Sequence, residues 1–156
     1  MIDIREVTEA QTKSTICNDI LRALPNWFGN EEAIVDYADK VKTMPFCAVL
    51  VDDAPVGFLA IKAHNEHTAE VCVMGILTSH HRQGIGRAMI GWCEDRCKAE
   101  GKSFLTVKTL DGSHPSKSYA RTRLFYEGMG FVPLEVFPLH WGADDPCLMM
   151  IKYLGR

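Results

Sequence analysis

The stretch from residue 76 to 88 joins an expected strand to an expected helix through a loop that contains Gly84 and Gly86. The N–H groups in the first turn of a helix have no intrahelical partners, and the helix dipole is positive there, so such a loop can bind an anion. Glycine lets the backbone approach a phosphate, and Arg82 and Arg87 flank the loop with donors suited to phosphate. The pattern predicts a phosphate-binding loop, and a plain strand-to-helix turn is the alternative.

Two common phosphate-binding loops do not fit this stretch. A dinucleotide-binding loop needs a third glycine where the chain has Met89, and it does not follow an antiparallel hairpin, which is expected here. A P-loop needs lysine and then serine or threonine after its last glycine, where the chain has Arg87 and Ala88. An enzyme that binds ATP or NAD is therefore only a third interpretation.

The spacing of apolar residues predicts the elements before this loop. Alternation predicts strands, and a period of three to four residues predicts helices. We expect a strand, two helices and three further strands over residues 2–7, 9–24, 30–44, 46–51, 56–62 and 68–77, with Thr8 as the first N-cap and a turn at residues 52–55. Gly75, inside the last of these strands, marks a bulge or a close approach of the backbone.

The elements after the loop begin with the clearest helix, residues 84–100. Its apolar stripe includes Cys93 and Cys97, and Gly101 is expected to end it. A strand, a helix and two strands follow, over residues 104–107, 118–129, 131–137 and 147–153. An antiparallel front half with one strand-helix-strand crossover predicts a single domain over residues 1–156, of mixed α/β class.

Composition narrows the class of partner. The chain has 156 residues, with 17 lysines and arginines against 20 aspartates and glutamates, and the net charge of -3 disfavours nucleic acid. Its apolar runs are far shorter than the ~20 residues that cross a bilayer, so we expect a soluble, unprocessed protein without a membrane partner. The six cysteines lack the spacing of zinc sites, which predicts buried thiols, no metal and a cytoplasmic location.

A larger pattern of motifs covers the chain. His81-Arg82-Gln83-Gly84-Ile85-Gly86 resembles the [Gln/Arg]-x-x-Gly-x-[Gly/Ala] signature of the GNAT superfamily of N-acetyltransferases, although His81 departs from it. Phe125-Tyr126-Glu127-Gly128-Met129-Gly130-Phe131 resembles a second hallmark, Phe-Tyr-x-x-x-Gly-Phe. The expected order of elements is also similar to that family's. The resemblance implies a mostly antiparallel central sheet, splayed at the fourth and fifth strands, with helices on both faces.

The same resemblance implies acetyl-CoA as co-substrate and N-acetyl transfer as the activity. It implies that the pantetheine arm pairs with the backbone of Ile76 and Leu77. It also implies that the pyrophosphate lies on the backbone of the loop, at Arg82, Gln83, Gly84, Ile85, Gly86 and Arg87. Tyr119 stands where the family often has an asparagine that contacts the cofactor, and its phenol could supply another hydrogen bond.

Acetyl transfer to an amine makes three chemical demands. An alkyl amine has a pKa of about 10.4, so a base must take its proton before it attacks, an oxyanion must be stabilised, and a thiolate must leave. A backbone N–H at a bulge near Gly75 and Ile76 could stabilise the oxyanion. Tyr126 matches the tyrosine that is proposed to protonate the thiolate across the family, and packing of its ring on the sheet is the alternative.

Glu70 is the candidate base. It alternates with Val71 and Val73, which directs its carboxylate to the other side of the sheet, where it could reach an amine directly or through water. A solvated strand carboxylate is the alternative. His64 and His67 can titrate near neutral pH, but their loop position predicts surface residues.

The acceptor pocket is expected in the loops around residues 25–35 and 138–147. Trp27, Phe28 and Trp141 would be its apolar walls, and its acids would be Glu31, Glu32, Asp144 and Asp145. These favour a cationic primary amine, on a small molecule or on a protein or peptide. Because no cysteine adjoins the loop, we expect direct attack in a ternary complex. A non-catalytic acyl-CoA sensor is the alternative, and a homodimer is left open.

Overall fold

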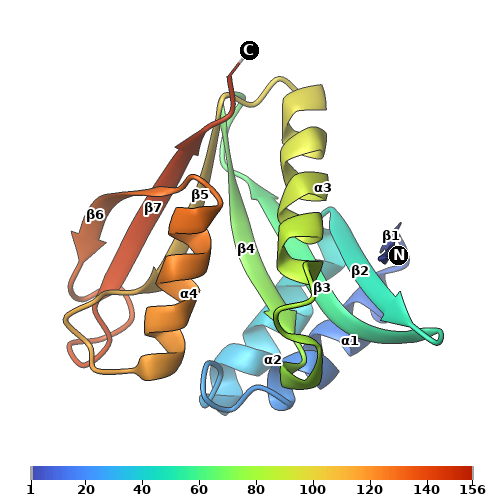
Figure 1. Cartoon of the computed structure of the whole chain (residues 1–156), viewed down its shortest axis with the longest axis horizontal. Coiled ribbons are helices and arrows are strands. Elements are labelled where there is room, and N and C mark those ends of the chain that lie inside the picture. The colour runs from blue at the N-terminus through green and yellow to red at the C-terminus, as the bar shows by residue number, and fades with distance from the viewer. Residues whose placement is uncertain (1, 156) are drawn as a thin grey trace. The chain divides into compact units, whose positions relative to one another are not determined.

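The computed structural model describes residues 2–155, and its elements follow the order expected from the sequence (Figure 1). The strands and helices are β1 (Asp3–Glu6), α1 (Ala10–Arg22), α2 (Glu31–Lys40), β2 (Phe46–Val51), β3 (Ala54–Ala63), β4 (Thr68–Ile76), α3 (Ile85–Ala99), β5 (Phe104–Leu110), α4 (Lys117–Gly128), β6 (Val132–Phe137) and β7 (Cys147–Tyr153). Two short 3-10 helices are η1 (Val41–Thr43) and η2 (Thr78–His80).

The strands form one seven-stranded mixed sheet in the order β1-β2-β3-β4-β5-β7-β6. β4 and β5 are parallel, whereas β1 with β2, β2 with β3, β5 with β7 and β6 with β7 are antiparallel. Within the described residues the β4–β5 ladder joins only Thr68–Val71 to Phe104–Val107, although both strands continue beyond it. The mixed fold class is therefore confirmed.

The chain packs as two compact units, residues 1–62 with 72–96 and residues 63–71 with 97–156. In the first unit, α1 and α2 lie on one face of the strands and α3 lies on the other (Figure 1). The core under α1 and α2 includes Ile16, Leu21 and Val73, together with Phe46 and Phe58, whose rings stack with centroids 5.4 Å apart. This unit has the helices on both faces that the resemblance implied.

Gly75 lets α1 pack directly on β4. A Cβ atom at this position would lie 3.1 Å from Ile20 Cγ2, 3.1 Å from Leu24 Cδ1 and 3.3 Å from Phe58 Cε1. These separations are shorter than ordinary van der Waals contacts, so a side chain would displace the core. The close approach predicted at Gly75 is confirmed.

The register of β3 and β4 shifts by one residue along the pair. The His64 N–H donates to the Thr68 carbonyl at 3.0 Å, and an unbroken antiparallel register from there would place Val56 opposite Ile76. Instead the Leu77 N–H donates to the Val56 carbonyl at 2.9 Å. The segment from Thr68 to Leu77 therefore contains one residue more than its partner, which is the signature of a β-bulge.

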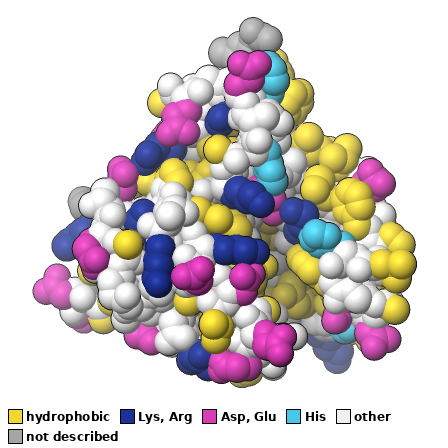
Figure 2. Space-filling view, turned by 180° about the vertical axis from the view of Figure 1, so that it is seen from behind, with side chains coloured by type: hydrophobic (Ala, Val, Ile, Leu, Met, Phe, Trp, Pro, Cys, Tyr) yellow, Lys and Arg dark blue, Asp and Glu magenta, His cyan; other side chains and the backbone are white. Residues whose placement is uncertain are grey.

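In the second unit, α4 packs on one face of the strands. The Lys152 Nζ donates to the Met129 carbonyl at 2.7 Å, and Arg123 Nη1 donates to the Leu110 carbonyl at 2.6 Å. The other face of the strands carries exposed apolar side chains, which Figure 2 shows in yellow. Among the exposed residues of this unit, Phe104 and Tyr153 pair across β5 and β7 with ring centroids 5.6 Å apart.

Several element boundaries differ from the predictions. The second helix ends at Lys40 and tightens into η1, because the residue before Pro45 is extended rather than helical. The hairpin turn has only two residues, Asp52 and Asp53, whose φ angles of 51° and 65° suit the twist of the strands. The first N-cap is Glu9 rather than Thr8, because the Glu9 carboxylate accepts two N–H groups of the first turn.

Candidate active site and cofactor loop

The loop before α3 has the backbone shape of an anion site. Arg82 and Gly84 adopt left-handed conformations, with φ angles of 61° and 80°. The first bond of the helix runs from the Ala88 N–H to the Gly84 carbonyl at 3.0 Å, which leaves the N–H groups of residues 85–87 without intrahelical acceptors. Arg82, Gln83 and Gly84 are exposed. These residues therefore fit the phosphate-binding loop that the sequence predicts.

His81 holds this loop against the end of β4. Its Nε2 lies 2.7 Å from the Ile76 carbonyl oxygen, and because a carbonyl only accepts, Nε2 carries the proton. The His81 ring also contacts Trp27 edge to face, with centroids 5.8 Å apart. The histidine that departs from the family signature is thus a structural anchor, a role that sequence reasoning missed.

The backbone of Leu77 is already engaged inside the protein. Its N–H donates to the Val56 carbonyl, and its carbonyl accepts from the His80 N–H at 2.9 Å. These bonds fix the end of β4 and the start of η2. The pairing of Ile76 and Leu77 with a pantetheine arm remains a prediction.

Glu70 is buried and lies in a cluster with two basic side chains that are partly exposed. Its Oε1 is 2.6 Å from His64 Nε2, and Lys108 Nζ donates to both carboxylate oxygens at 3.0 and 3.1 Å. The Glu70 side chain is 6% exposed, against 32% for His64 and 21% for Lys108. The parallel register pairs Glu70 with Thr106, so Lys108, two residues further along β5, lies on the same face.

This cluster corrects one interpretation. Glu70 is not a solvated carboxylate, because its side chain is buried and both its oxygens are bonded. His64 and His67 are both exposed, as expected, but His64 also bonds to Glu70, which the sequence did not indicate. Periodicity gave the face of Glu70, but the contact with Lys108 joins residues 38 positions apart and has no local signal.

Tyr126 and Tyr119 both belong to α4. Tyr126 is 6% exposed, and its ring packs edge-on against Phe131 with centroids 5.7 Å apart. Burial, and after it the Asp145 carboxylate, raise the pKa of Tyr119 to about 12, so this phenol stays protonated and able to donate at neutral pH. The ring packing of Tyr126 is compatible with either of its predicted roles.

The predicted acceptor residues lie in both units. Trp27 and Phe28 are half-buried in the first unit and pack against its core, and Phe28 contacts the Tyr37 ring edge to face. Trp141 is 38% exposed in the second unit, where its ring lies 6.1 Å from that of His140. The substrate-binding role of these three residues remains a prediction.

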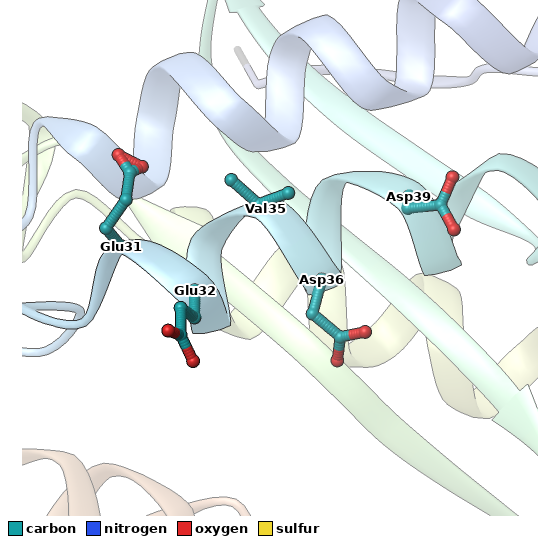
Figure 3. Close-up of a pocket in the computed structure, with 5 residues that line it drawn as sticks. All are labelled: Glu31, Glu32, Val35, Asp36 and Asp39. Atoms are coloured by element: carbon teal, nitrogen blue, oxygen red, sulfur yellow. The ribbon is translucent and has the colours of Figure 1, made fainter.

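A hollow of about 500 Å³ runs along α2 and is lined by Glu31, Glu32, Val35, Asp36 and Asp39 (Figure 3). Arg22 binds both oxygens of Glu31 at 2.6 and 2.7 Å, and Lys40 lies 2.7 Å from Asp36. None of the candidate catalytic residues lines this hollow. Its carboxylates are exposed and largely paired within the protein, so we assign no chemistry to it.

Residues 14–131 match the model of the acetyltransferase (GNAT) family, and the chain belongs to that family. Comparison with curated proteins gives no match. Within residues 2–155, no helix has the length and apolarity needed to cross a membrane.

Solved structures share the fold at low sequence identity. A GNAT-family protein from Desulfovibrio desulfuricans superposes with a TM-score of 0.81 at 18% identity, over 99% of this chain and 100% of that one. An aminoglycoside 6'-N-acetyltransferase complexed with coenzyme A gives 0.78 at 18% identity, over 99% and 98%. The ribosomal-protein-S18-alanine N-acetyltransferase from Escherichia coli gives 0.76 at 16% identity, over 100% and 96%.

Proposed function

We propose that this protein transfers an acetyl group from acetyl-CoA to a primary amine, by direct attack in a ternary complex. The observation that carries the proposal is the loop before α3, which combines the left-handed Gly84 with first-turn N–H groups that have no intrahelical acceptors. This loop lies inside the segment that matches the acetyltransferase family. Its shape and charge suit a pyrophosphate.

Acetyl-CoA would bind along the loop and the end of β4. The backbone of residues 82–87 would hold the pyrophosphate, and Ile76 and Leu77 would pair with the pantetheine arm. Tyr119, whose phenol is held protonated by burial, would donate a hydrogen bond to the cofactor. A structurally similar aminoglycoside acetyltransferase has been solved in complex with coenzyme A, which supports acetyl-CoA as the acetyl donor here.

The chemistry requires a base and an acid from the protein. The ammonium form of the acceptor must lose a proton, for which Glu70 is the predicted base, directly or through water, so that the amine nitrogen can attack the thioester carbonyl carbon. When the carbon–sulfur bond breaks, Tyr126 would give its proton to the departing thiolate. A backbone N–H of the β4 bulge would stabilise the oxyanion formed between these two steps.

The acceptor is proposed to be a cationic amine on a small molecule, a protein or a peptide. Trp27, Phe28 and Trp141 would provide its apolar contacts. Similar folds belong to proteins named for an aminoglycoside and for a ribosomal protein, so the fold accommodates both classes. The six cysteines, all among the described residues, are thiols, which is typical of a reducing compartment and supports a cytoplasmic location.

Mass spectrometry of the acceptor tests this proposal. The purified protein is incubated with acetyl-CoA and, separately, spermidine, kanamycin, phenethylamine and a peptide with a free N-terminal alanine. We expect an acceptor that gains one acetyl group together with stoichiometric release of free CoA. Tight binding of acetyl-CoA with no acetylated amine above the protein-free blank would favour an acyl-CoA sensor instead.

A further inference from the structure

We infer that Glu70 acts through His64, so that the proton of the attacking amine is received by Nδ1 of His64 while Glu70 and Lys108 hold the imidazole in place. The inference rests on the proposed acetyl transfer and names the base of that same site. It follows from the geometry of the cluster formed by His64, the buried Glu70 and Lys108.

Glu70 is poorly placed to receive a proton itself. Its side chain is 6% exposed, and its two oxygens already accept hydrogen bonds from Lys108, with His64 at 2.6 Å from Oε1. An amine could reach the carboxylate only by displacing one of these partners. Losing a bonded partner of a buried charge is costly, so this route is unfavourable.

His64 has the free ring nitrogen that the reaction needs. A carboxylate flanked by an ammonium group accepts hydrogen bonds, so His64 Nε2 carries the proton in this pair and Nδ1 keeps its lone pair. The side chain is 32% exposed, which leaves the ring accessible from solvent. A neutral imidazole oriented by a carboxylate is a competent general base.

The proton balance closes on these groups. Nδ1 of His64 takes one proton from the acceptor nitrogen and becomes part of an imidazolium ion, whose charge the adjacent Glu70 carboxylate offsets. The Nδ1 proton then passes to solvent, which restores the neutral ring. Tyr126 would meanwhile protonate the CoA thiolate, as proposed above.

The turn that carries His64 is firmly held. Asn65 Oδ1 accepts the N–H groups of His67 and Thr68 at 2.8 and 3.0 Å, and Lys102 Nζ donates to the Asn65 carbonyl at 2.7 Å. A side chain on a fixed turn loses little entropy on reaching its reactive position. The turn therefore positions the imidazole in advance.

Neighbouring groups cannot replace His64 as the base. The Lys108 ammonium forms an ion pair with Glu70, and an ammonium group has no lone pair to offer. Burial raises the pKa of the Cys147 thiol to about 11, and this thiol also senses the charges of Lys108 and Glu70. Two other charged residues lie at the turn. Lys102 donates to the Asn65 carbonyl, and the exposed Glu66 lies 3.1 Å from His67.

Steady-state kinetics with the best amine of the panel tests the inference. We expect His64→Gln to lower kcat/KM by ~10²–10³ at pH 7, because the amide side chain cannot take the proton of the amine. The affinity for acetyl-CoA should not change. His67→Gln is the matched control, since it removes an exposed histidine three residues away, and it should behave like the wild type.

Two further measurements separate a base from a structural residue. Imidazole added to the buffer should restore activity to His64→Ala, and the double variant of His64→Gln with Glu70→Gln should be no slower than the worse single variant. If the variants misfold, the imidazole nitrogen NMR shifts of wild-type His64 still test the inference. They should report a proton on Nε2 and none on Nδ1 at pH 8.

The opposing outcomes are distinct. An inactive Glu70→Gln beside a His64→Gln with wild-type kcat/KM, or a failure of imidazole to rescue a folded His64→Ala, would overturn the role of His64 and leave acetyl transfer standing. A proton on Nδ1 rather than Nε2 would also overturn it. A wild-type protein that acetylates no amine would overturn the proposed function and this inference together.

Discussion

Tyr126 is the residue whose side chain has one function in the fold and another in the proposed reaction. Its ring fills the space beside Phe131, and its hydroxyl is the proposed proton donor to the thiolate. The variant Tyr126→Phe separates the two functions, because phenylalanine keeps the ring and lacks the hydroxyl. The packing is then preserved while the acid is lost.

We predict that Tyr126→Phe lowers kcat by ~10²–10⁴ with little change in acetyl-CoA affinity, because general-acid assistance is lost only in the transition state. A time course of CoA release measures kcat, and calorimetric titration measures the affinity for acetyl-CoA. Tyr119→Phe, on the same helix, is the matched variant and should weaken acetyl-CoA binding more than it lowers kcat. Unchanged turnover in Tyr126→Phe would assign this residue to packing alone.

At the residue scale the sequence predicts faces better than partners. Alternation along β4 was enough to turn Glu70 away from Val71, because side chains on a strand alternate regardless of what lies opposite. The bond to Lys108 depends on the parallel register of two strands far apart in the chain. The bond to His64 depends on the geometry of a turn, which periodicity does not describe.

At the scale of elements, β4 is the strand on which the candidate site depends. It carries Glu70 at one end, Gly75 beneath α1, and the carbonyl that His81 holds at the other end. Its register with β3 shifts by one residue along the way. The position of α1 therefore depends on the missing side chain of Gly75.

We predict that Gly75→Val destabilises the protein by about 1–3 kcal/mol, because its methyl groups would overpack the contact with Ile20 and Leu24. Urea unfolding followed by circular dichroism measures the change. A free energy of unfolding equal to that of the wild type would mean that α1 does not pack against β4 as closely as described.

Gly91 offers the contrasting case within α3. A Cβ atom there would meet nothing within 4 Å, and glycine in a helix interior is less favourable than alanine. We predict that Gly91→Ala raises the free energy of unfolding by roughly 0.5–1 kcal/mol in the same urea experiment. A loss of stability would contradict the open space beside this residue.

The order of elements was predictable because each strand or helix has its own apolar period. The ends of the strands and helices were harder to predict, because they depend on local hydrogen bonds. Glu9 rather than Thr8 caps α1, and the short η2 helix before the loop has no apolar repeat of its own. His81 was expected only as a departure from a motif, and its bond to Ile76 became evident in three dimensions.

At the scale of the whole molecule, the account predicts that acetyl-CoA binding stabilises the fold. A ligand at about 100 times its Kd adds about 2.7 kcal/mol, which for a chain of this size raises Tm by roughly 5–10 °C. A thermal-shift series with acetyl-CoA, CoA, ATP and NAD checks this. Stabilisation by ATP or NAD in preference to CoA would point to the nucleotide-binding alternative.

Calorimetric titration of acetyl-CoA into the wild type, Gly86→Val and Arg87→Ala tests most directly whether the loop from Arg82 to Arg87 binds the cofactor. The account predicts a severe loss of affinity in Gly86→Val, because a side chain intrudes where the phosphate meets the backbone. It predicts a smaller loss in Arg87→Ala, which removes an exposed and screened charge. With the fold of each variant verified by its Tm, unchanged affinity in both would contradict the binding of acetyl-CoA by this loop.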